Sequence, residues 1–569
     1  MSQSVIILPE IPIANWYSIN SERSIEDQII DAIIGKIDPD NRDSYFNSAL
    51  KDIPNPSSLK DIDLAADIFI NAIRKNKNIL VVGDYDVDGI TATALLIRFF
   101  IKLGFQNYDS FIPNRFIQGY GLTDKTVEII LSRKPDLVIT VDNGITAKQE
   151  IARIKENGIE VIVTDHHLPQ TDFLPECPII NPKQDDCRFP FKYLAGVGVV
   201  FLFLIFVRTK LRDLRFWNDS RPEPNLLEHL DLVALGTVAD QVPLLGLNRV
   251  FTRFGLDQMT KKLHEGYPHE FFNYIKIYAE KTNLKNFNSE TIAFGLAPMI
   301  NAAGRMKDAE DGLKFLLSED EVTASSRYQY LDRINQKRRK KQQTMAKKAQ
   351  HKAKRLVKEG RGIVVYDESF HEGLIGVIAS RLVDEFHYPS IVMTDGENGI
   401  LKASCRSQSE DIMDILKECD EYLVHYGGHS NAAGFAIDRD NLEKFHDRFT
   451  RICDELIPKD RDYVVKANIE VKIEMMTYDL IDKLRILEPF GHQNRKPVFY
   501  LGNMSLPVPT VLTGKHLKWR LQPDLELIFW NGADTVKHSE TYDIACTIGE
   551  NIYRGERKRQ MIVRTIVST

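Results

Sequence analysis

Residues 79–89 read ILVVGDYDVDG, an apolar run that ends in alternating aspartates. A short run rich in Ile, Leu and Val that stops at a glycine is typical of a buried strand. The aspartates also match the opening of an EF-hand loop, but such a loop needs a glutamate at its twelfth position, where this chain has Leu95. We therefore expect a strand that presents Asp84, Asp86 and Asp88 at the edge of a sheet.

Three further apolar runs end in the same kind of residue. VDNG (141–144) closes one run, DHH (165–167) closes another, and Asp240 follows the run 230–239. The pattern predicts four strands that each deliver a carboxylate or an imidazole to one edge. A lone aspartate there usually caps a helix or a loop. So many carboxylates beside two histidines instead match the ligands of hard divalent cations, and they predict a metal-dependent hydrolase.

The segments between these runs have helical patterns. We expect helices over 91–103 and 147–157, and a buried helix over 193–207. Alternating strands and helices predict an α/β fold with a parallel sheet covered on both faces. Ligands of such sheets bind outside the carboxyl ends of the strands, where the acidic motifs are expected to lie.

A long polar helix is expected over 321–359. Between Lys337 and Arg355 it contains no acidic residue. Such a helix can be a solvated connector, or it can also contact phosphates. A second α/β pattern follows from Gly362 to about residue 451, and short strands separated by turns then predict a small β-barrel.

Composition limits the class of protein. The chain has 569 residues, 43% hydrophobic and 27% charged, with a net charge of −6. This length suggests about four folding units, and the charge excludes a uniformly basic coat but not a local basic groove. Six scattered cysteines without a CxxC pair favour a reducing, cytoplasmic location. We expect no signal peptide and no membrane span, since the longest uncharged apolar stretch, 193–207, is shorter than the roughly 20 residues that a span needs.

The motifs DYDVDG, VDNG, DHH and GTVAD, in this order, resemble those of the DHH phosphoesterase superfamily. GGH (427–429) with NAAG (431–434) resembles the associated DHHA1 domain. Further motifs narrow the resemblance to the RecJ family of single-stranded-DNA-specific exonucleases: PNR (113–115), GYGL (119–122), LAGVG (194–198), NAAGR (301–305), SCRS (404–407) and LEPFG (487–491). The resemblance runs from about Asp61 to the C-terminus.

This resemblance implies a domain order. It is an N-terminal segment (1–60), a parallel-sheet DHH catalytic domain (61–320), a connecting helix (321–359), an α/β DHHA1 substrate-binding domain (360–456) and an OB-type β-barrel that binds DNA (457–569). The implied activity is 5′→3′ hydrolysis of single-stranded DNA by two metal ions, in recombination and repair. The implied partners are single-stranded DNA, the single-stranded-DNA-binding protein and a recombination helicase, and the chain is expected to be a monomer.

The resemblance also assigns the metal ligands. Two ions, Mn²⁺ or Mg²⁺, are expected. The first would be held by Asp86 and Asp142, and the second by Asp88, Asp142, His166 and Asp240, with Asp142 as the bridge. Relatives often have a histidine where this chain has Val82, so the first ion would also rely on Asp84. His167 would orient the scissile phosphate or the attacking water, assisted by Asp165, and Arg305 would contact phosphate.

Substrate-binding residues are expected in all three domains. They are Arg115, Tyr120, Asn301, Arg381, Arg406, Ser407, Gly428, His429, Lys518 and Arg520. A glycine turn before a helix is an anion site, and this is one interpretation of Gly428 and His429. In the barrel, the alternation over 516–521 predicts that Lys518 and Arg520 share a face while Trp519 is in the core.

Two alternatives remain open. One is a DHH phosphodiesterase that cleaves short RNA or cyclic dinucleotides, although such relatives lack the barrel and the long basic helix. The other is a non-catalytic DNA-binding scaffold, which predicts missing ligands. Cleavage of long DNA compared with a dinucleotide separates the first, and a metal-dependent assay with a chelator control separates the second.

Overall fold

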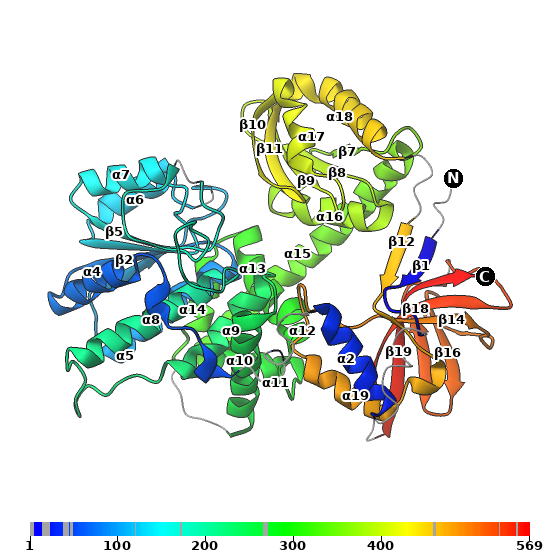
Figure 1. The fold of residues 1–569 in the computed structure, drawn as a ribbon. Coiled ribbons are helices and arrows are strands. Elements are labelled where there is room, and N and C mark those ends of the chain that lie inside the picture. The colour runs from blue at the N-terminus through cyan, green and yellow to red at the C-terminus, as the bar shows by residue number, and fades with distance from the viewer. Residues whose placement is uncertain are drawn as a thin grey trace. The chain divides into compact units, whose positions relative to one another are not determined.

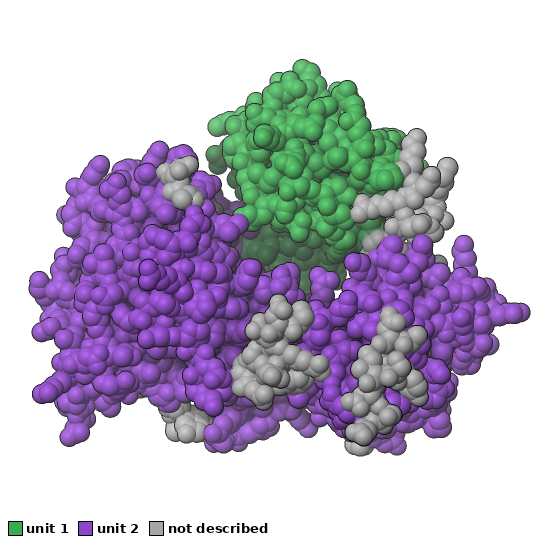
Figure 2. Space-filling model, viewed as in Figure 1, with its two compact units in different colours: residues 1–3, 305–307, 330–462 green, residues 4–304, 308–329, 463–569 purple. Residues whose placement is uncertain are grey.

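A computed structural model describes residues 5–13, 23–37, 45, 49–119, 121–170, 173–265, 271–458, 463–533, 535–553 and 556–569. The chain divides into two compact units, coloured separately in Figure 2. Unit 1 contains Arg305–Lys307 and Tyr330–Asp462, and unit 2 contains Ser4–Gly304, Asp308–Gln329 and Tyr463–Thr569. Within the described ranges, no helix is long and apolar enough to cross a membrane.

Unit 2 contains the parallel sheet that the sequence predicts. Its strand order is β3-β2-β4-β5-β6, and every pairing is parallel. Figure 1 labels two of these strands, β2 and β5. The chain leaves β2 toward β3 on one side and β4 toward β5 on the other, so the order reverses between β2 and β4. The strands span Tyr108–Phe111, Ile79–Gly83, Leu137–Val141, Glu160–Thr164 and Ile179–Ile180.

Helices cover both faces of this sheet, and its central strands β2 and β4 are therefore buried throughout. On one face, Val82 and Val138 pack with Ile130 of α6 and Ile151 of α7. On the other face lie α5 and α8, with α4 packed against α8. The helices are α4 (Ile62–Arg74), α5 (Val87–Leu103), α6 (Asp124–Arg133), α7 (Lys148–Glu156) and α8 (Gly196–Asp213).

The prediction of a fourth strand, over residues 230–239, is wrong. Residues 230–239 form helix α9 (Leu230–Ala239), and Asp240 is its C-cap residue. Every residue from Leu230 to Val238 is buried, so the run has no polar face to reveal a helical period. An apolar run of this kind cannot be assigned from periodicity alone. The aspartate still reaches the site, but it arrives from a helix.

A buried ion pair ties α5 to α9. Arg98 Nη1 lies 3.1 Å from Asp231 Oδ2, and both side chains are at most 2% exposed. Tyr274 of α11 donates its hydroxyl to the same carboxylate at 2.8 Å. Arg98 also donates to the backbone oxygens of Phe271 and Leu316. The surrounding helices are α10 (Gly246–Glu265), α11 (Asn273–Thr282), α12 (Ser289–Thr291), α13 (Ala297–Met306) and α14 (Glu310–Leu316).

The C-terminal part of unit 2 is a seven-stranded sheet of order β13-β14-β18-β19-β17-β16-β15. Trp519 is 2% exposed inside it, as predicted. The sequence predicts strands here over 467–473, 498–501, 516–521, 525–530 and 544–548; it does not predict β15 and β19, which alternate less clearly. The strands span Ile469–Glu470, Phe499–Met504, Tyr542–Tyr553, Glu556–Ser568, Leu525–Phe529, His516–Gln522 and Thr510–Leu512, and helix α19 spans Tyr478–Leu484.

The N-terminal segment packs on this C-terminal sheet, which the sequence did not indicate. Strand β1 (Val5–Pro9) pairs in parallel with β12 (Tyr463–Ala467). Helix α2 (Ile25–Ile37) contributes its apolar face to the core that α19 also enters. The hydroxyl of Tyr45 donates to Asn494 Oδ1 at 2.8 Å. The two ends of the chain therefore share one hydrophobic core.

Unit 1 is built on a sheet of order β10-β11-β9-β8-β7. Val364 faces α17 and α18, whereas its neighbours Ile363 and Val365 face α16 and the end of α15. This alternation gives the unit two apolar cores. The elements are β7 (Ile363–Tyr366), β8 (Ser390–Asp395), β9 (Ile400–Arg406), β10 (Leu423–His429), β11 (Ala432–Asp438), α15 (Glu321–Leu356), α16 (Ile375–Phe386), α17 (Ile412–Lys417) and α18 (Leu442–Leu456).

The interpretation of the glycine motif as a turn before a helix is wrong. Gly428 and His429 lie at the end of β10, the edge strand of this sheet, and His429 pairs with Ala432 of β11. A glycine pair in an alternating segment is ambiguous between a turn and a strand end. The anion-binding argument from a helix N-terminus therefore does not apply at this place.

Replacing Asp231 by alanine should lower the free energy of unfolding of unit 2 by about 3–5 kcal/mol, because the Arg98 guanidinium would be left buried without a counter-charge. Urea unfolding followed by circular dichroism measures this change. The matched control is Glu310→Ala, which breaks the half-exposed pair with Lys314 and should cost far less. Similar losses in both variants would contradict a stabilising role of the buried pair.

Candidate metal centre

The ends of β2, β4, β5 and α9 bring carboxylates and imidazoles together. Nε2 of His166 lies 3.1 Å from Asp142 Oδ1, 3.5 Å from Asp240 Oδ2 and 3.8 Å from Asp88 Oδ2. Ligands that surround one ion at about 2.1 Å are separated by about 3 Å. Three groups each hold ligand atoms within 4.8 Å of one another: Asp84, Asp86 and Asp142; Asp88, His166 and Asp240; Asp142, His166 and His167.

Buried polar atoms in this cluster lack hydrogen-bond partners among the described residues. They include Oδ1 of Asp84, Oδ1 of Asp142 and Nε2 of His166. Buried polar atoms are normally satisfied, and leaving them unpaired costs free energy. A divalent cation would satisfy all of them with oxygen and imidazole ligands. The donor set therefore fits a hard divalent metal.

Burial and mutual repulsion shift the pKa values of the carboxylates. Burial, followed by the charge of Asp86, raises the pKa of Asp88 to about 7. Burial and neighbouring carboxylates also raise the pKa values of Asp84, Asp142 and Asp240 well above the ordinary value. Without a cation, the protein therefore holds protons on these groups that a bound metal would displace.

The second histidine of the motif has a different environment. Nδ1 of His167 lies 2.7 Å from Asp165 Oδ1. Burial lowers the pKa of His167, but the charge of Asp165 and this hydrogen bond outweigh burial and raise it to about 9. Burial raises the pKa of Asp165, but the charge of His167 brings it down to about 2. Asp165 also accepts from the backbone nitrogens of Ile145, His166 and His167, so it fixes the loop that carries both histidines.

The N-terminus of α8 contacts the cluster directly. The backbone nitrogens of Gly196 and Val197 donate to Asp88 at 2.6 and 2.9 Å. Backbone N–H groups in the first turn of a helix have no acceptor within the helix, and they lie at its positive end, so they stabilise a carboxylate there. A Cβ at position 196 would lie 2.7 Å from Asp142 Oδ1, so only glycine lets the helix approach. The sequence motif LAGVG (194–198) contains this glycine but does not by itself indicate this role.

The backbone of Asp142 is unusual. Its φ angle is +62°, a left-handed conformation that non-glycine residues rarely adopt and that is frequent at functional sites. Next to it, Asn143 donates its side-chain amide to the backbone oxygens of Val82 and Val141 at 3.1 and 2.9 Å. This amide ties the ends of β2 and β4 together. The sequence pattern VDNG indicates a turn at this place, because Asn and Gly favour such conformations.

One metal candidate, Asp86, also caps a helix, and Asn181 supports the loop that carries the histidines. Asp86 is the N-cap of α5, and its Oδ1 accepts from the backbone nitrogens of Asp88 and Gly89 at 2.9 and 3.2 Å. Capping and metal binding use different lone pairs of one carboxylate, so the two interpretations coexist. Asn181, which the sequence did not single out, donates to the backbone oxygen of His167 at 2.9 Å and supports the histidine loop.

The predicted substrate-binding residues of unit 2 are dispersed. The guanidinium carbon of Arg115 lies 5.5 Å from the ring centroid of Tyr85, beside the first aspartate motif. Asn301 lies in α13 and is half-buried. In the C-terminal sheet, Lys518 forms an ion pair with Glu526 at 2.8 Å, and Arg520 donates to the backbone oxygen of Pro523. Tyr120 lies outside the described residues.

In unit 1, β9 and β10 carry three of the six remaining candidates, Arg406, Gly428 and His429. Arg406 at the end of β9 pairs with Ala432, which in turn pairs with His429. Arg406 donates to Ser404 Oγ at 2.9 Å, which orients its guanidinium. The other candidates of this unit are Ser407, which donates to Glu410; Gly428, next to His429; Arg381, exposed on α16; and Arg305, half-buried in the last turn of α13.

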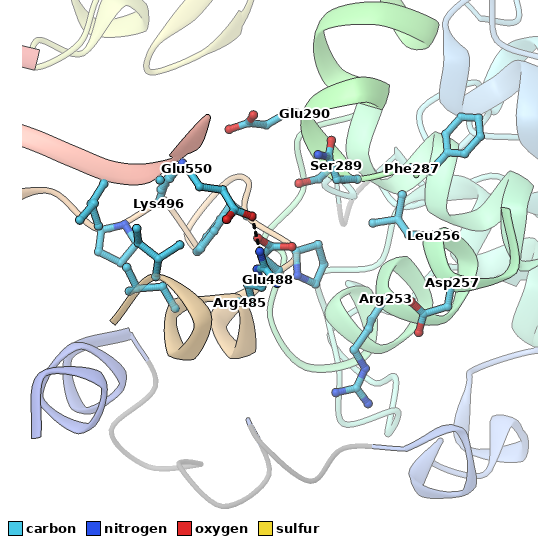
Figure 3. Close-up of a pocket in the computed structure, with 18 residues that line it drawn as sticks. Arg253, Leu256, Asp257, Phe287, Ser289, Glu290, Arg485, Glu488, Lys496 and Glu550 are labelled. Atoms are coloured by element: carbon cyan, nitrogen blue, oxygen red, sulfur yellow. Dashed lines mark hydrogen bonds and ion pairs between the residues drawn. The ribbon is translucent and has the colours of Figure 1, made fainter. Parts of the chain in front are cut away.

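A cavity of about 510 Å³ lies elsewhere in unit 2, lined by α10, α12 and parts of the C-terminal sheet (Figure 3). None of its lining residues belongs to the carboxylate cluster. Its charged residues are mixed: Arg253, Arg485 and Lys496 face Asp257, Glu290, Glu488 and Glu550. Glu550 is already paired with Arg485. The four carboxylates disfavour a phosphate ligand, so we do not assign the nucleic-acid backbone to this cavity.

Three family models match the chain: DHH family, N-terminal domain, over residues 78–237; DHHA1 domain over 359–455; and RecJ OB domain over 467–565. Among curated proteins, the chain is 36% identical to a single-stranded-DNA-specific exonuclease RecJ of Salmonella typhimurium, covering 89% of this chain and 90% of that protein. It is 34% identical to the RecJ of Bacillus subtilis, covering 81% of this chain and 56% of that protein.

Solved structures match over the whole chain. RecJ of Thermus thermophilus in complex with Mn²⁺ has a TM-score of 0.82 and 28% identity, covering 100% of this chain and 80% of that one. The same protein in complex with Mg²⁺ has a TM-score of 0.76 and 26% identity, covering 100% of this chain and 78% of that one. Both ions are hard divalent cations, the class that the donor set fits.

The raised pKa of Asp88 makes metal binding and stability depend on pH. In EDTA, the folded protein binds a proton on Asp88 that the unfolded chain has lost, so the stabilisation from this group is complete below about pH 4 and is lost as pH rises through about 7. Mn²⁺ displaces this proton, so its stabilising effect should grow with pH. We expect a larger rise in Tm on adding Mn²⁺ at about pH 8 than at about pH 5.5.

Asp88→Asn is the matched control for that measurement, because an amide does not titrate. In EDTA, the Tm of the wild type should fall relative to that of this variant between about pH 4 and 7. Parallel Tm profiles of the two proteins would show that Asp88 has an ordinary pKa and would contradict the electrostatic description of the centre.

Proposed function

The chain belongs to the RecJ family of single-stranded-DNA-specific exonucleases, and from this premise we propose that its metal centre hydrolyses single-stranded DNA stepwise from the 5′ end, in recombination and repair. The observation that carries the proposal is the cluster of buried, unpaired carboxylate and imidazole atoms at the ends of β2, β4 and β5. The family membership supplies the substrate, and the cluster supplies a site for the chemistry. An intact ligand set also disfavours a non-catalytic scaffold.

We assign two Mn²⁺ or Mg²⁺ ions to this centre. Asp84, Asp86 and Asp142 would hold the first. Asp88, Asp142, His166 and Asp240 would hold the second, so Asp142 would contact both. Two such ions stabilise the attacking and leaving oxygens of an in-line displacement at phosphorus and lower the pKa of the attacking water. The buried position of Val82, where relatives often have histidine, leaves the first ion with carboxylates alone.

His167 and Asp165 act together on the substrate. The charge of Asp165 and its hydrogen bond with His167 Nδ1 favour the protonated form of His167, whose pKa in the metal-free protein is about 9. Its Nε2–H can donate to a non-bridging phosphate oxygen, while Asp165 holds Nδ1 and fixes the direction of the ring. The charge of His167 then stabilises the additional negative charge of the transition state. Positioning by Asp165 keeps this proton in place throughout the reaction.

The remaining candidates would bind the strand. Arg406, with Ser407, and His429, with Gly428, would contact a phosphate from unit 1, and Arg305 and Arg381 would contribute further charge there. In unit 2, Arg115 and Asn301 would contact the strand near the centre, and Tyr120 is assigned from the family motif alone. Lys518 and Arg520 would follow the backbone on the barrel, as OB-folds do. A polyanion exchanges its counterions for these cations, so binding should weaken with salt.

The domain boundaries are proposed as the sequence indicated: 1–60, 61–320, 321–359, 360–456 and 457–569. We also propose that the protein works in the cytoplasm as a monomer, and that it acts with a single-stranded-DNA-binding protein and a recombination helicase. These assignments rest on the family. The chain spans 90% of its Salmonella typhimurium relative, which supports a similar domain order.

Asp142→Ala should reduce Mn²⁺-dependent hydrolysis of single-stranded DNA by several orders of magnitude, because it removes the carboxylate shared by both ion positions. Binding of the same DNA should change little. The measurement is digestion of an end-labelled strand, with fluorescence anisotropy in EDTA for binding. The control is Asp63→Ala, which alters an exposed carboxylate paired with Lys210. Metal-dependent turnover retained in the Asp142 variant would contradict the bridging assignment.

The same assay tests substrate and direction. We expect shortening from the 5′ end of single-stranded DNA, little cleavage of a duplex, and slow cleavage of a dinucleotide. Faster turnover of the dinucleotide than of the long strand would instead support a phosphodiesterase for short RNA or cyclic dinucleotides. Shortening from the 3′ end would overturn the proposed direction without affecting the metal centre.

A further inference from the structure

A second cavity, of about 260 Å³, lies in unit 1 and differs in charge from the larger one. Its lining is Met306, Lys307, Tyr330, Arg333, Ile334 and Lys337. Three of these side chains are cationic and none is acidic. The other three are an aromatic ring and two aliphatic side chains. The volume is smaller than the roughly 300–1,000 Å³ of a pocket for a drug-sized ligand, and it suits one planar ring system.

Helix α15 creates this arrangement through its sequence spacing. Tyr330, Arg333, Ile334 and Lys337 occupy positions i, i+3, i+4 and i+7, which lie on one helix face. Ile334 is 5% exposed and forms the floor of the cavity. Arg333 and Lys337 are exposed at its rim. Lys307, the residue after α13, places its Nζ 5.7 Å from the ring centroid of Tyr330.

The electrostatic surroundings favour an anion. The next turn of α15 carries Arg338, whose guanidinium donates to Asn335 Oδ1 at 2.8 Å and to Gln342 Oε1 at 3.2 Å. Both acceptors are neutral amides. Burial, followed by the charges of Arg305, Arg339 and Arg381, lowers the pKa of Arg338 to about 10. The smaller contributions show that Arg305, Arg339 and Arg381 place further positive charge near Arg338, which a polyanionic ligand would partly neutralise.

We propose that this cavity binds one nucleotide of the single-stranded DNA substrate. The base enters the apolar cavity against the ring of Tyr330, with Met306 and Ile334 as the other walls. The phosphates on either side contact Lys307, Arg333 and Lys337. Proteins that bind single strands combine an aromatic platform with a cationic groove in this way. The site rests on the proposed function and adds a place where the strand is gripped through a base as well as its backbone.

An acidic peptide would use the same three cations, but the cavity favours DNA. Its walls are apolar apart from the cationic head groups, and its one aromatic ring, Tyr330, is a stacking partner for a base once Lys307 moves from the ring to a phosphate. The acid-free stretch from Lys337 to Arg355 lies on the same helix. Lys348 and Lys352 in it pair with Asp367, and the exposed Arg339, Lys340 and Lys341 lie next to the cavity in sequence. Stacking is tolerant of base identity, as a sequence-independent exonuclease requires.

Tyr330→Ala should weaken binding of a fluorescein-labelled oligo(dT) of about 20 nucleotides by about tenfold, since it removes one stacking contact. Fluorescence anisotropy in EDTA measures the Kd without hydrolysis. An abasic strand of equal length and charge should bind the wild type and this variant with similar affinity. Tyr330→Phe keeps the ring and should bind as the wild type does.

The rim is tested separately with a double variant, Lys307→Gln with Lys337→Gln. The slope of log Kd against log salt concentration should become shallower by about 1.4, because two phosphate contacts to a single strand are lost. The matched control is Lys444→Gln, an exposed lysine on α18 in the same unit, which should leave the slope unchanged. This arm also decides the question if circular dichroism shows that Tyr330→Ala does not fold.

The outcomes separate this site from the proposed function. If the wild type neither binds nor degrades single-stranded DNA, the function is wrong. If the wild type does both, but Tyr330→Ala binds oligo(dT) as tightly as the wild type, the nucleotide site is overturned and the function stands. Equal weakening toward the intact and abasic strands would also overturn it, because the cavity would then hold no base. Equal salt slopes for the double variant and Lys444→Gln would show that Lys307 and Lys337 do not contact phosphates, which would overturn that part of the proposal.

Discussion

Electrostatic repulsion among the buried carboxylates at the strand ends is the constraint on which the rest of unit 2 depends. Six aspartates lie in or next to this cluster. Burial raises the free energy of the charged forms of Asp84, Asp88, Asp142 and Asp240. Protons relieve the repulsion in part, and divalent cations would relieve it more completely. An arrangement this costly to ionise has a physical explanation as a metal centre, and its position at the switch point between β2 and β4 is where parallel sheets bind ligands.

The fold supplies the cluster through compromises in the surrounding backbone. Asp142 takes a left-handed conformation, and α8 begins at a glycine because any side chain there would collide with the Asp142 carboxylate. The backbone donors of α8 then partly neutralise Asp88. On the other side, the buried pair of Arg98 and Asp231 holds α9, which carries Asp240, against α5, which carries Asp88. The left-handed backbone of Asp142 and the buried Arg98–Asp231 pair thus hold mutually repelling carboxylates in a fixed geometry.

Much of this centre could be predicted because strands, turns and metal ligands leave local signals. The runs before Asp84, Asp142 and Asp165 are short and end in turn residues, and all three proved to be strands. The run before Asp240 is buried on every side, so no polar face distinguished its helix from a strand. The glycines at 427 and 428 fit a turn equally well as an edge strand. The pairing of β1 with β12 joins residues more than 450 positions apart, and a single sequence gives no local sign of such a contact. The backbone donors of Gly196 and Val197 were also missed, because a backbone group has no residue type to reveal it.

The most direct measurement of the central claim is electron paramagnetic resonance of the protein loaded with two equivalents of Mn²⁺. A carboxylate shared by two ions places them about 3.5–4 Å apart, where their electron spins couple. The account predicts a spin-coupled spectrum in the wild type and the spectrum of isolated Mn²⁺ in Asp142→Ala. An uncoupled signal from two equivalents of tightly bound Mn²⁺ in the wild type would contradict a shared centre at the ends of β2, β4 and β5.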